Sequence, residues 1–102
     1  MIQFNTTFFI PVDKVGDASA WMMENYMPEL RKKCGANVML GRLLTALEDD
    51  HVGLTAIARF ESVPEAEEWD ATYGASLRQQ MGIALKMPQV LHFSSMIEII
   101  EA

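Results

Sequence analysis

Two residues of this chain place a chemically useful group on a predicted strand. Arg59 lies in the largely apolar segment 53–61, where a cation needs an anion or water beside it. Glu61 or Glu98 would supply that anion within the chain, and a carboxylate or phosphate ligand would supply it from outside. His92 has an ordinary pKa near neutrality, so it suits a general base, a ligand or a hydrogen-bonded histidine in an interface.

Three further side chains complete the candidate site. Asn5 and Thr7 alternate along the first predicted strand, and the strands that carry Arg59 and His92 are expected on either side of it. These four side chains would then meet in one cavity. Trp69 has core spacing on a predicted helix, where it either packs or borders a ligand pocket. His92 and Arg59 are the catalytic candidates, and all five residues are candidates for ligand binding.

Other chemical motifs are sparse. His51 follows Glu48, Asp49 and Asp50, a grouping that suits a metal ion but is more typical of a solvated turn. The sequence contains no glycine-rich phosphate loop, no zinc-ligand spacing and no serine-centred nucleophile motif. We therefore expect neither a metal nor a cofactor.

Hydrophobic periodicity predicts the elements that would position these side chains. Residues 2–11 alternate in polarity, which is typical of a strand. Apolar residues then recur at helical spacing over 18–34. We expect a kink or a restart near Met27, because Pro28 cannot continue a regular helix. Gly35 is a natural end for this helix.

The rest of the chain is predicted to form two strands, a helix and a last strand. Strands are predicted over 37–47 and 53–61, joined by a polar turn over 48–51. A second helix begins at Ser62, whose hydroxyl can cap it in a capping box with Glu65, and ends near Lys86. Gly74 weakens the middle of this helix, so we expect a bend there. Residues 89–100 form the last predicted strand.

This order, β-α-β-β-α-β, predicts an α+β fold of the ferredoxin-like type. Its four strands form an antiparallel sheet in the order 4-1-3-2, with both helices on one face. The 102 residues suit a single domain spanning 1–102.

The polarity of the strands suggests which face the helices cover. The more apolar set is expected beneath the helices: Phe4, Phe8, Ile10, Ala56, Ala58, Phe60, Phe93 and Ile97. The uncovered set mixes apolar and polar residues: Gln3, Asn5, Thr7, Phe9, Thr55, Ile57, Arg59, His92, Ser94, Met96 and Glu98. In the second strand, either Met39, Leu43 and Leu47 or Val38, Leu40 and Leu44 point away from the helices. An exposed apolar patch of this size predicts a homodimer that pairs sheet to sheet.

Composition excludes several classes of partner. The formal net charge is −6, which disfavours nucleic acid and anionic membrane surfaces. No apolar stretch approaches the roughly 20 residues that span a bilayer, and residues 1–7 do not resemble a signal peptide. Cys34 is the single cysteine, so an internal disulfide is impossible. These features predict a cytoplasmic protein.

Three segments carry a resemblance to known proteins. They are Trp21–Leu30 (Trp-Met-Met-Glu-Asn-Tyr-Met-Pro-Glu-Leu), Leu77-Arg78-Gln79-Gln80 and Phe93–Ile100. With them the chain resembles an uncharacterised bacterial family, a domain of unknown function of similar length, within the dimeric α+β barrel superfamily. That superfamily includes small monooxygenases, haem-degrading enzymes, isomerases and sensing modules, so the resemblance implies a fold and a dimer rather than an activity.

The haem-degrading members combine an asparagine on the first strand with a tryptophan in the second helix and a histidine soon after it. Asn5 and Trp69 occupy comparable places here, but no histidine follows, so the resemblance does not imply haem. Two functions remain open. The first is a dimeric ligand-binding or interaction module, with a small acidic or aromatic ligand between the sheets. The second is a cofactor-free monooxygenase- or isomerase-type enzyme in which His92 and Arg59 face the same void.

Overall fold

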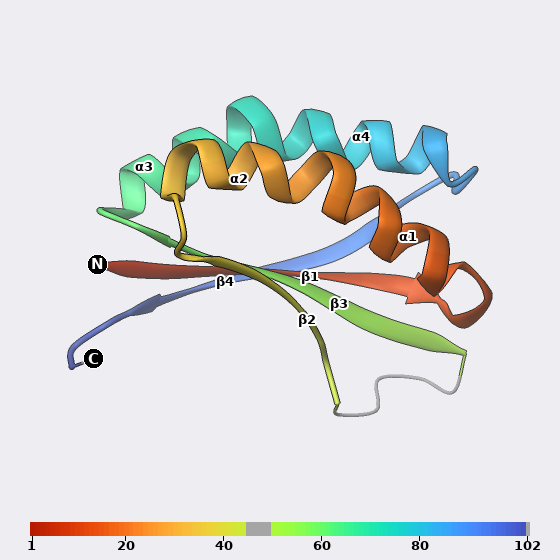
Figure 1. Cartoon of the computed structure of the whole chain (residues 1–102), viewed down its shortest axis with the longest axis horizontal. Helices are drawn as coiled ribbons and strands as arrows, with labels where there is room; N and C mark the ends of the chain where they lie inside the picture. The colour runs from red at the N-terminus through yellow and green to blue at the C-terminus, as the bar shows by residue number, and fades with distance from the viewer. Residues whose placement is uncertain (45–49, 102) are drawn as a thin grey trace.

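The chain folds into one antiparallel sheet with all its long helices on the same side (Figure 1). The computed structural model describes residues 1–44 and 50–101. The sheet has the order β2-β3-β1-β4. Its strands are β1 (Ile2–Pro11), β2 (Val38–Arg42), β3 (His51–Phe60) and β4 (Leu91–Glu98). This confirms the predicted fold and strand order.

The first long helix consists of two α-helical segments joined by a π-helical turn. A short 3-10 turn, η1 (Val12–Lys14), leads into α1 (Val15–Trp21), η2 (Met22–Tyr26) and α2 (Met27–Cys34). The N–H of Met27 bonds to the carbonyl of Met22, five residues back, and Pro28 lies in the first turn of α2. The predicted restart at Met27 is therefore confirmed, and Gly35 ends the helix with a φ of 65°.

The second long helix has the same construction. It comprises α3 (Val63–Trp69), the π-helical turn η3 (Asp70–Gly74) and α4 (Ala75–Ala84). The Ser62 hydroxyl accepts a hydrogen bond from the Glu65 N–H at 3.4 Å, so the predicted cap is present. The predicted irregularity at Gly74 coincides with the π-helical turn. Such turns are rare and frequently occur at functional sites.

The hydrophobic core lies between the helices and the sheet. Aromatic rings form its centre: Tyr26 contacts Phe8 and Trp69 edge to face, with ring centroids 5.4 and 5.7 Å apart. Phe4, Phe8, Ile10, Ala56, Ala58 and Phe60 are buried under the helices, as the sequence predicts. Because Ala56 and Ala58 are small, the helices can approach β3 closely.

The predicted orientation of β4 is wrong. Phe4 pairs with Met96, Thr6 with Ser94 and Phe8 with His92. Directly opposite residues in an antiparallel pair point to the same face, so the even-numbered residues of β4 face the helices. Phe93 and Ile97, which were expected in the core, therefore point to the uncovered side. His92, Ser94, Met96 and Glu98, which were expected on that side, point toward the helices.

The pairing of β2 settles the register that the sequence left open. Val38 pairs with the buried Ala58, and Met39 pairs with Ile57. Val38 and Leu40 therefore face the helices, while Met39 points away from them. Residues 45–49, including Leu47 and part of the predicted polar turn, lie outside the described residues. Within residues 1–44 and 50–101, no helix has the length and apolar character needed to cross a membrane.

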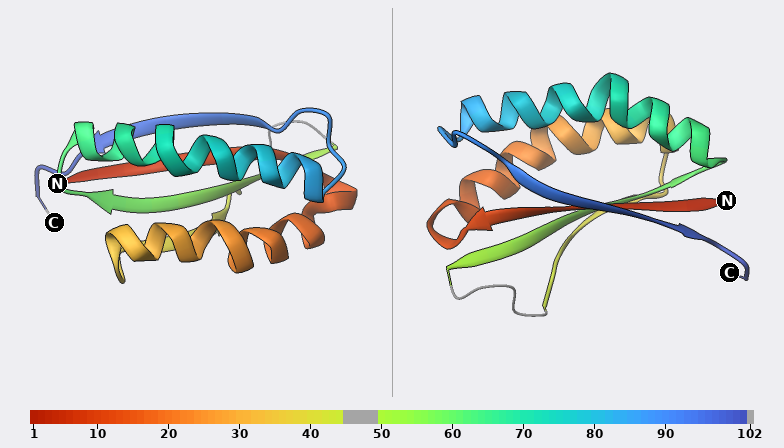
Figure 2. Two further views of the ribbon diagram at one scale, coloured as in Figure 1. Left: turned by 90° about the horizontal axis from the view of Figure 1, so that it is seen from above. Right: turned by 180° about the vertical axis from the view of Figure 1, so that it is seen from behind.

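The side of the sheet without helices is named the open face. Its residues on all four strands are Gln3, Asn5, Thr7, Phe9, Pro11, Met39, Gly41, His51, Gly53, Thr55, Ile57, Arg59, Leu91, Phe93, Ser95 and Ile97. Large apolar side chains on it remain exposed: Met39 and Phe93 at 61%, Leu91 at 51% and Ile97 at 50%. Figure 2 shows this face free of helices, and shows β4 at the outer margin of the helix layer.

Candidate functional site

Three of the predicted site residues lie together on the open face. Asn5 and Thr7 lie on β1, and Arg59 pairs with Gln3 at one end of β3. The side chains of β1 have polar partners: the Gln3 amide donates to the Asn5 oxygen at 3.3 Å, and the hydroxyls of Thr7 and Thr55 lie 2.9 Å apart. Arg59 is exposed and forms no ion pair with any residue that the structure describes. We name the side chains of Gln3, Asn5, Thr7 and Thr55, with the Arg59 cation at one end, the polar band. It crosses the open face between apolar side chains.

The other two predicted site residues lie on the opposite side of the sheet. His92 faces the helices because it pairs with the buried Phe8, and Trp69 is buried among aromatic rings in the core. The predicted single cavity containing Asn5, Thr7, Arg59 and His92 is therefore not formed within one protomer. The hypothesis of an enzyme requires His92 and Arg59 to face the same cavity, but the two residues lie on opposite sides of the sheet. Glu98 also faces the helix side, away from Arg59.

His51 has a hydrogen-bond partner in the residue before it. Its Nδ1 lies 2.8 Å from the Asp50 carboxylate, and this hydrogen bond lowers the pKa of Asp50. Glu48 and Asp49 lie outside the described residues, so the acidic grouping around His51 is only partly described. Among the described residues, no group of three or more potential ligands could hold a metal ion.

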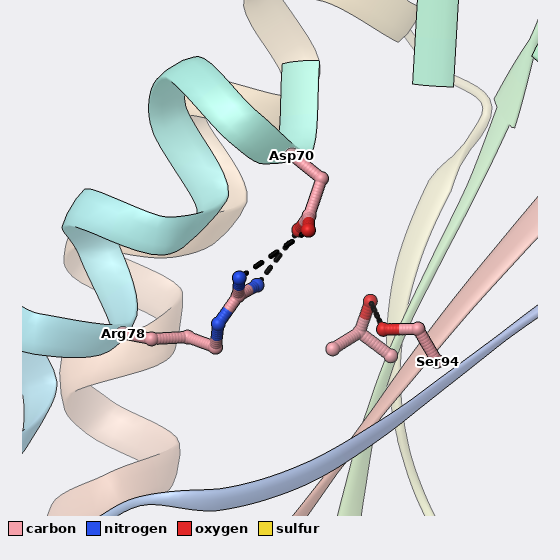
Figure 3. Close-up of polar contacts among 4 residues, drawn as sticks. Asp70, Arg78 and Ser94 are labelled. Carbon is pink, nitrogen blue, oxygen red and sulfur yellow. Dashed lines mark hydrogen bonds and ion pairs between the residues drawn. The ribbon is translucent and has the colours of Figure 1, made fainter. Parts of the chain in front are cut away.

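The second long helix carries an ion pair between Asp70 and Arg78. Nη1 of Arg78 donates to Oδ1 of Asp70 at 2.7 Å, and Nη2 donates to Oδ2 at 3.3 Å. The side chains are 14% and 26% exposed, so solvent screens this bidentate pair only partly. Figure 3 shows Asp70 and Arg78 on the helix and Ser94 across from them on β4.

Gly74 makes this ion pair possible. Asp70 and Arg78 are eight residues apart, so the line between their side chains passes over Gly74. A Cβ on residue 74 would overlap Oδ1 of Asp70 and would lie 3.2 Å from Nη1 of Arg78. The absence of a side chain at this position therefore leaves the space in which the carboxylate meets the guanidinium.

A buried tyrosine continues the polar contacts toward the sheet. Burial and the negative charge of Asp70 raise the pKa of Tyr26 to about 12, against opposing effects of Arg78 and of a hydrogen bond with Thr6. Thr6 is itself buried, and its hydroxyl lies 3.4 Å from that of Ser94. Tyr26 therefore stays protonated near neutral pH and acts as a hydrogen-bonding group rather than a base.

His92 lies beside the same charges. Partial burial of the ring and the positive charge of Arg78 lower the pKa of His92, while Asp70 and the backbone of Val90 act in the opposite direction. The Phe8 ring lies 6.3 Å from the imidazole. The imidazole is therefore neutral near pH 7. We name this group of side chains the Arg78 cluster: Thr6, Tyr26, Asp70, Arg78, His92 and Ser94.

The Arg78 cluster opens to solvent along β4. His92, Ser94 and Met96 face the helix layer yet remain exposed. A hollow of about 240 Å³ adjoins it, lined by Arg78, Gln79, Gly82, Ile83, Met87, Pro88 and Val90. On the helix side of the sheet, a solvent-accessible region thus brings together the Asp70–Arg78 ion pair, the neutral His92 ring and apolar side chains.

The sequence predicted His92 as a site residue but not the other members of the Arg78 cluster. A usable signal was present: Asp70, Gly74 and Arg78 recur every four residues, so they share one helix face with the small residue in the middle. Thr6 and Ser94 carried no such signal. They meet only because β1 and β4, far apart in the sequence, are neighbours in the sheet.

Comparison with known proteins establishes the fold. No protein-family model matches the chain, and no curated protein is detectably similar to it. Protein Atu4242 from Agrobacterium tumefaciens is similar in structure with a TM-score of 0.65, at 10% identity over 96% of this chain and 92% of that chain. A dimeric ferredoxin-like protein from an uncultured marine organism has a TM-score of 0.55, at 15% identity over 99% and 95%.

The C-terminal domain of MgtC from Mycobacterium tuberculosis is similar with a TM-score of 0.52, at 14% identity over 100% of this chain and 94% of that chain. At such low identity these likenesses concern the fold and carry no activity with them. The fold is thus a ferredoxin-like α+β domain of about 100 residues, as the sequence predicts, and no specific function is evident from the similar structures.

Proposed function

We propose that this chain is a small homodimeric binding module, formed as one domain over residues 1–102 and located in the cytoplasm. The observation that carries the dimer is the open face, where large apolar side chains on β2 and β4 stay half-exposed or more. An apolar patch that extends across a sheet usually marks an interface. A domain of this size also gains from additional burial against a partner.

A second copy of the chain is the occupant that fits this face best. The open face carries the polar band bordered by apolar side chains. A two-fold axis through the band would pack the band of one protomer against the band of its partner, and apolar side chains against apolar side chains. One structural neighbour is a dimeric ferredoxin-like protein, which supports the same assembly here. In this dimer Asn5, Thr7 and Arg59 of both protomers would border the inter-sheet space, where a small molecule could bind.

Net charge supports the choice of partners. With a formal charge of −6, the surface repels nucleic acid and anionic lipid, so neither belongs to the proposed function. An enzymatic function has less support, because His92 and Arg59 lie on opposite sides of the sheet.

Light scattering of the purified protein tests the dimer. We expect the mass of two chains for the natural sequence and of one chain for Phe93→Glu, because the substitution would bury a carboxylate in the interface. Ile83→Glu is the matched control, since Ile83 is 74% exposed on α4 and should leave the mass unchanged. A monomeric natural protein, or a Phe93→Glu variant that stays dimeric, would contradict the proposal. Native mass spectrometry of the same samples would detect a small molecule that co-purifies.

A further inference from the structure

The hollow beside the Arg78 cluster has the size and the lining of a small-molecule site. Its volume of about 240 Å³ is below the roughly 300 Å³ at which pockets for drug-sized ligands begin. Arg78 supplies a cationic group at its wall, and Ile83, Met87 and Val90 supply apolar surface. Such a space suits a compact molecule with one polar end.

The hydrogen-bonding groups at this place define the polar end. Both carboxylate oxygens of Asp70 already accept from Arg78, and the Tyr26 hydroxyl interacts with Thr6 and Arg78. Arg78 has five N–H donors, of which Asp70 occupies two. The remaining N–H groups and the Ser94 hydroxyl can donate. The N–H of the neutral His92 ring is already engaged by the Val90 backbone, so the ring offers a further donor only when it is protonated. An excess of donors favours a head group that only accepts, as a carboxylate does.

We propose that this hollow binds a small monocarboxylate, whose carboxylate contacts Arg78 and His92 and whose apolar body lies against Ile83, Met87 and Val90. The inference goes beyond the proposed dimer, because it adds a ligand site on the helix side of the sheet, apart from the inter-sheet space between two protomers. It does not depend on the dimer, because every residue involved lies on the helix side of the sheet within one protomer.

The charges around His92 give this site a pH dependence. The imidazole is faced by Arg78 from α4, Asp70 from η3, the Phe8 ring from β1 and the backbone of Val90. In the free protein, burial and Arg78 oppose protonation of the ring. A bound carboxylate favours it, so the pKa of His92 is higher in the complex than in the free protein. Binding therefore takes up a proton, and affinity falls as the pH rises through the pKa of the complex.

Benzoate and benzamide form a matched pair of probes, because they share shape and ring but differ in charge. We expect calorimetric titration of the full chain at about pH 6 to give a Kd of about 1 mM for benzoate. We expect benzamide to bind at least about tenfold more weakly, since it lacks the charge that Arg78 and His92 recognise. Between about pH 6 and pH 8, benzoate affinity should fall by about threefold or more.

Four variants distinguish binding of benzoate in this hollow from effects elsewhere in the molecule. Ile83→Glu should abolish benzoate binding through charge repulsion and loss of space, and His92→Gln should remove the pH dependence. His51→Gln is the matched histidine control and should change neither. Phe93→Glu should lose the dimer and still bind benzoate, so that failure of the dimer and failure of the ligand site give different results. Nitrogen-edited NMR spectra of each variant verify that it is folded.

Three outcomes would overturn the inference. They are equal binding of benzoate and benzamide, undiminished benzoate binding by Ile83→Glu, and no binding of benzoate by the natural protein up to about 10 mM, roughly ten times the expected Kd.

Discussion

Alanine at position 74 offers a sharp test of how the Arg78 cluster is built. Glycine costs a helix about 1 kcal/mol relative to alanine, so the substitution alone should stabilise the second long helix by that amount. At this position, however, the new Cβ overlaps Oδ1 of Asp70, so the carboxylate must shift, and we expect the shift to break its contact with Arg78. Loss of a bidentate pair that is largely buried costs about 2 kcal/mol, between the values for exposed and fully buried pairs. Gly74→Ala should therefore lower the free energy of unfolding by about 1 kcal/mol.

Gly16 provides the matched control for this prediction. It lies in α1, and a Cβ there would meet no atom within 4 Å. Gly16→Ala should thus raise the free energy of unfolding by about 0.5–1 kcal/mol. Urea unfolding followed by circular dichroism, at one protein concentration for all variants, measures both changes. In thermal unfolding, the Gly74→Ala variant should melt about 4 °C below the natural protein.

A double-mutant cycle isolates the cause. In an Asp70→Ala background no carboxylate stands in the way, so Gly74→Ala should become stabilising by about 1 kcal/mol. The difference between the two backgrounds, about 2 kcal/mol, is the coupling between residues 70 and 74. Stabilisation of the natural protein by Gly74→Ala as large as that by Gly16→Ala would contradict this prediction, because the ion pair between Asp70 and Arg78 would then not depend on the space over Gly74.

Two further predictions concern the helix cap and the buried tyrosine. Ser62→Ala should lower the free energy of unfolding by about 0.5–1 kcal/mol through loss of the hydrogen bond to the Glu65 N–H; Ser62→Asp should retain stability, and equal loss in both variants would contradict a capping role. The pKa of Tyr26 rises from 10.0 to about 12 on folding, so the folded protein holds this proton over a pH range where the unfolded chain has lost it. Stability should therefore decline between about pH 10 and 12, by up to about 1.4 kcal/mol per pH unit. Denaturant unfolding across this range measures the decline, and Tyr26→Phe, which cannot ionise, should show less of it than the control Tyr73→Phe.

Most elements of the fold could be predicted because their signals are local. Alternation over 2–11 predicted β1 with its observed bounds, and the Ser62 cap predicted the start of the second helix. Pro28 and Gly74 marked the two helices as irregular, although the sequence did not show that each irregularity is a π-helical turn. Right-handed connections then limited the possible orders of the four strands to the one observed.

The candidate site was harder to predict because it depends on which way an edge strand faces. Alternation in β4 separates Phe93 and Ile97 from His92 and Ser94, but it does not say which set lies beneath the helices. Hydrophobicity favoured burial of Phe93, and pairing with β1 decided otherwise. At the margin of the helix layer the helices cover β4 poorly, so a polar face beneath them costs little desolvation.

The order of the elements, the faces of β1 and β3 and the acidic character of the surface could be predicted from the sequence, because each of these follows from neighbouring residues or from summed charge. The folded chain was needed to show that Arg59 and His92 lie on opposite sides of the sheet and that Asp70, Arg78, Tyr26 and His92 come together. Those relations depend on strand pairing and on the path of two helices over the sheet. Both are set by packing between segments far apart in the chain, which no local pattern records.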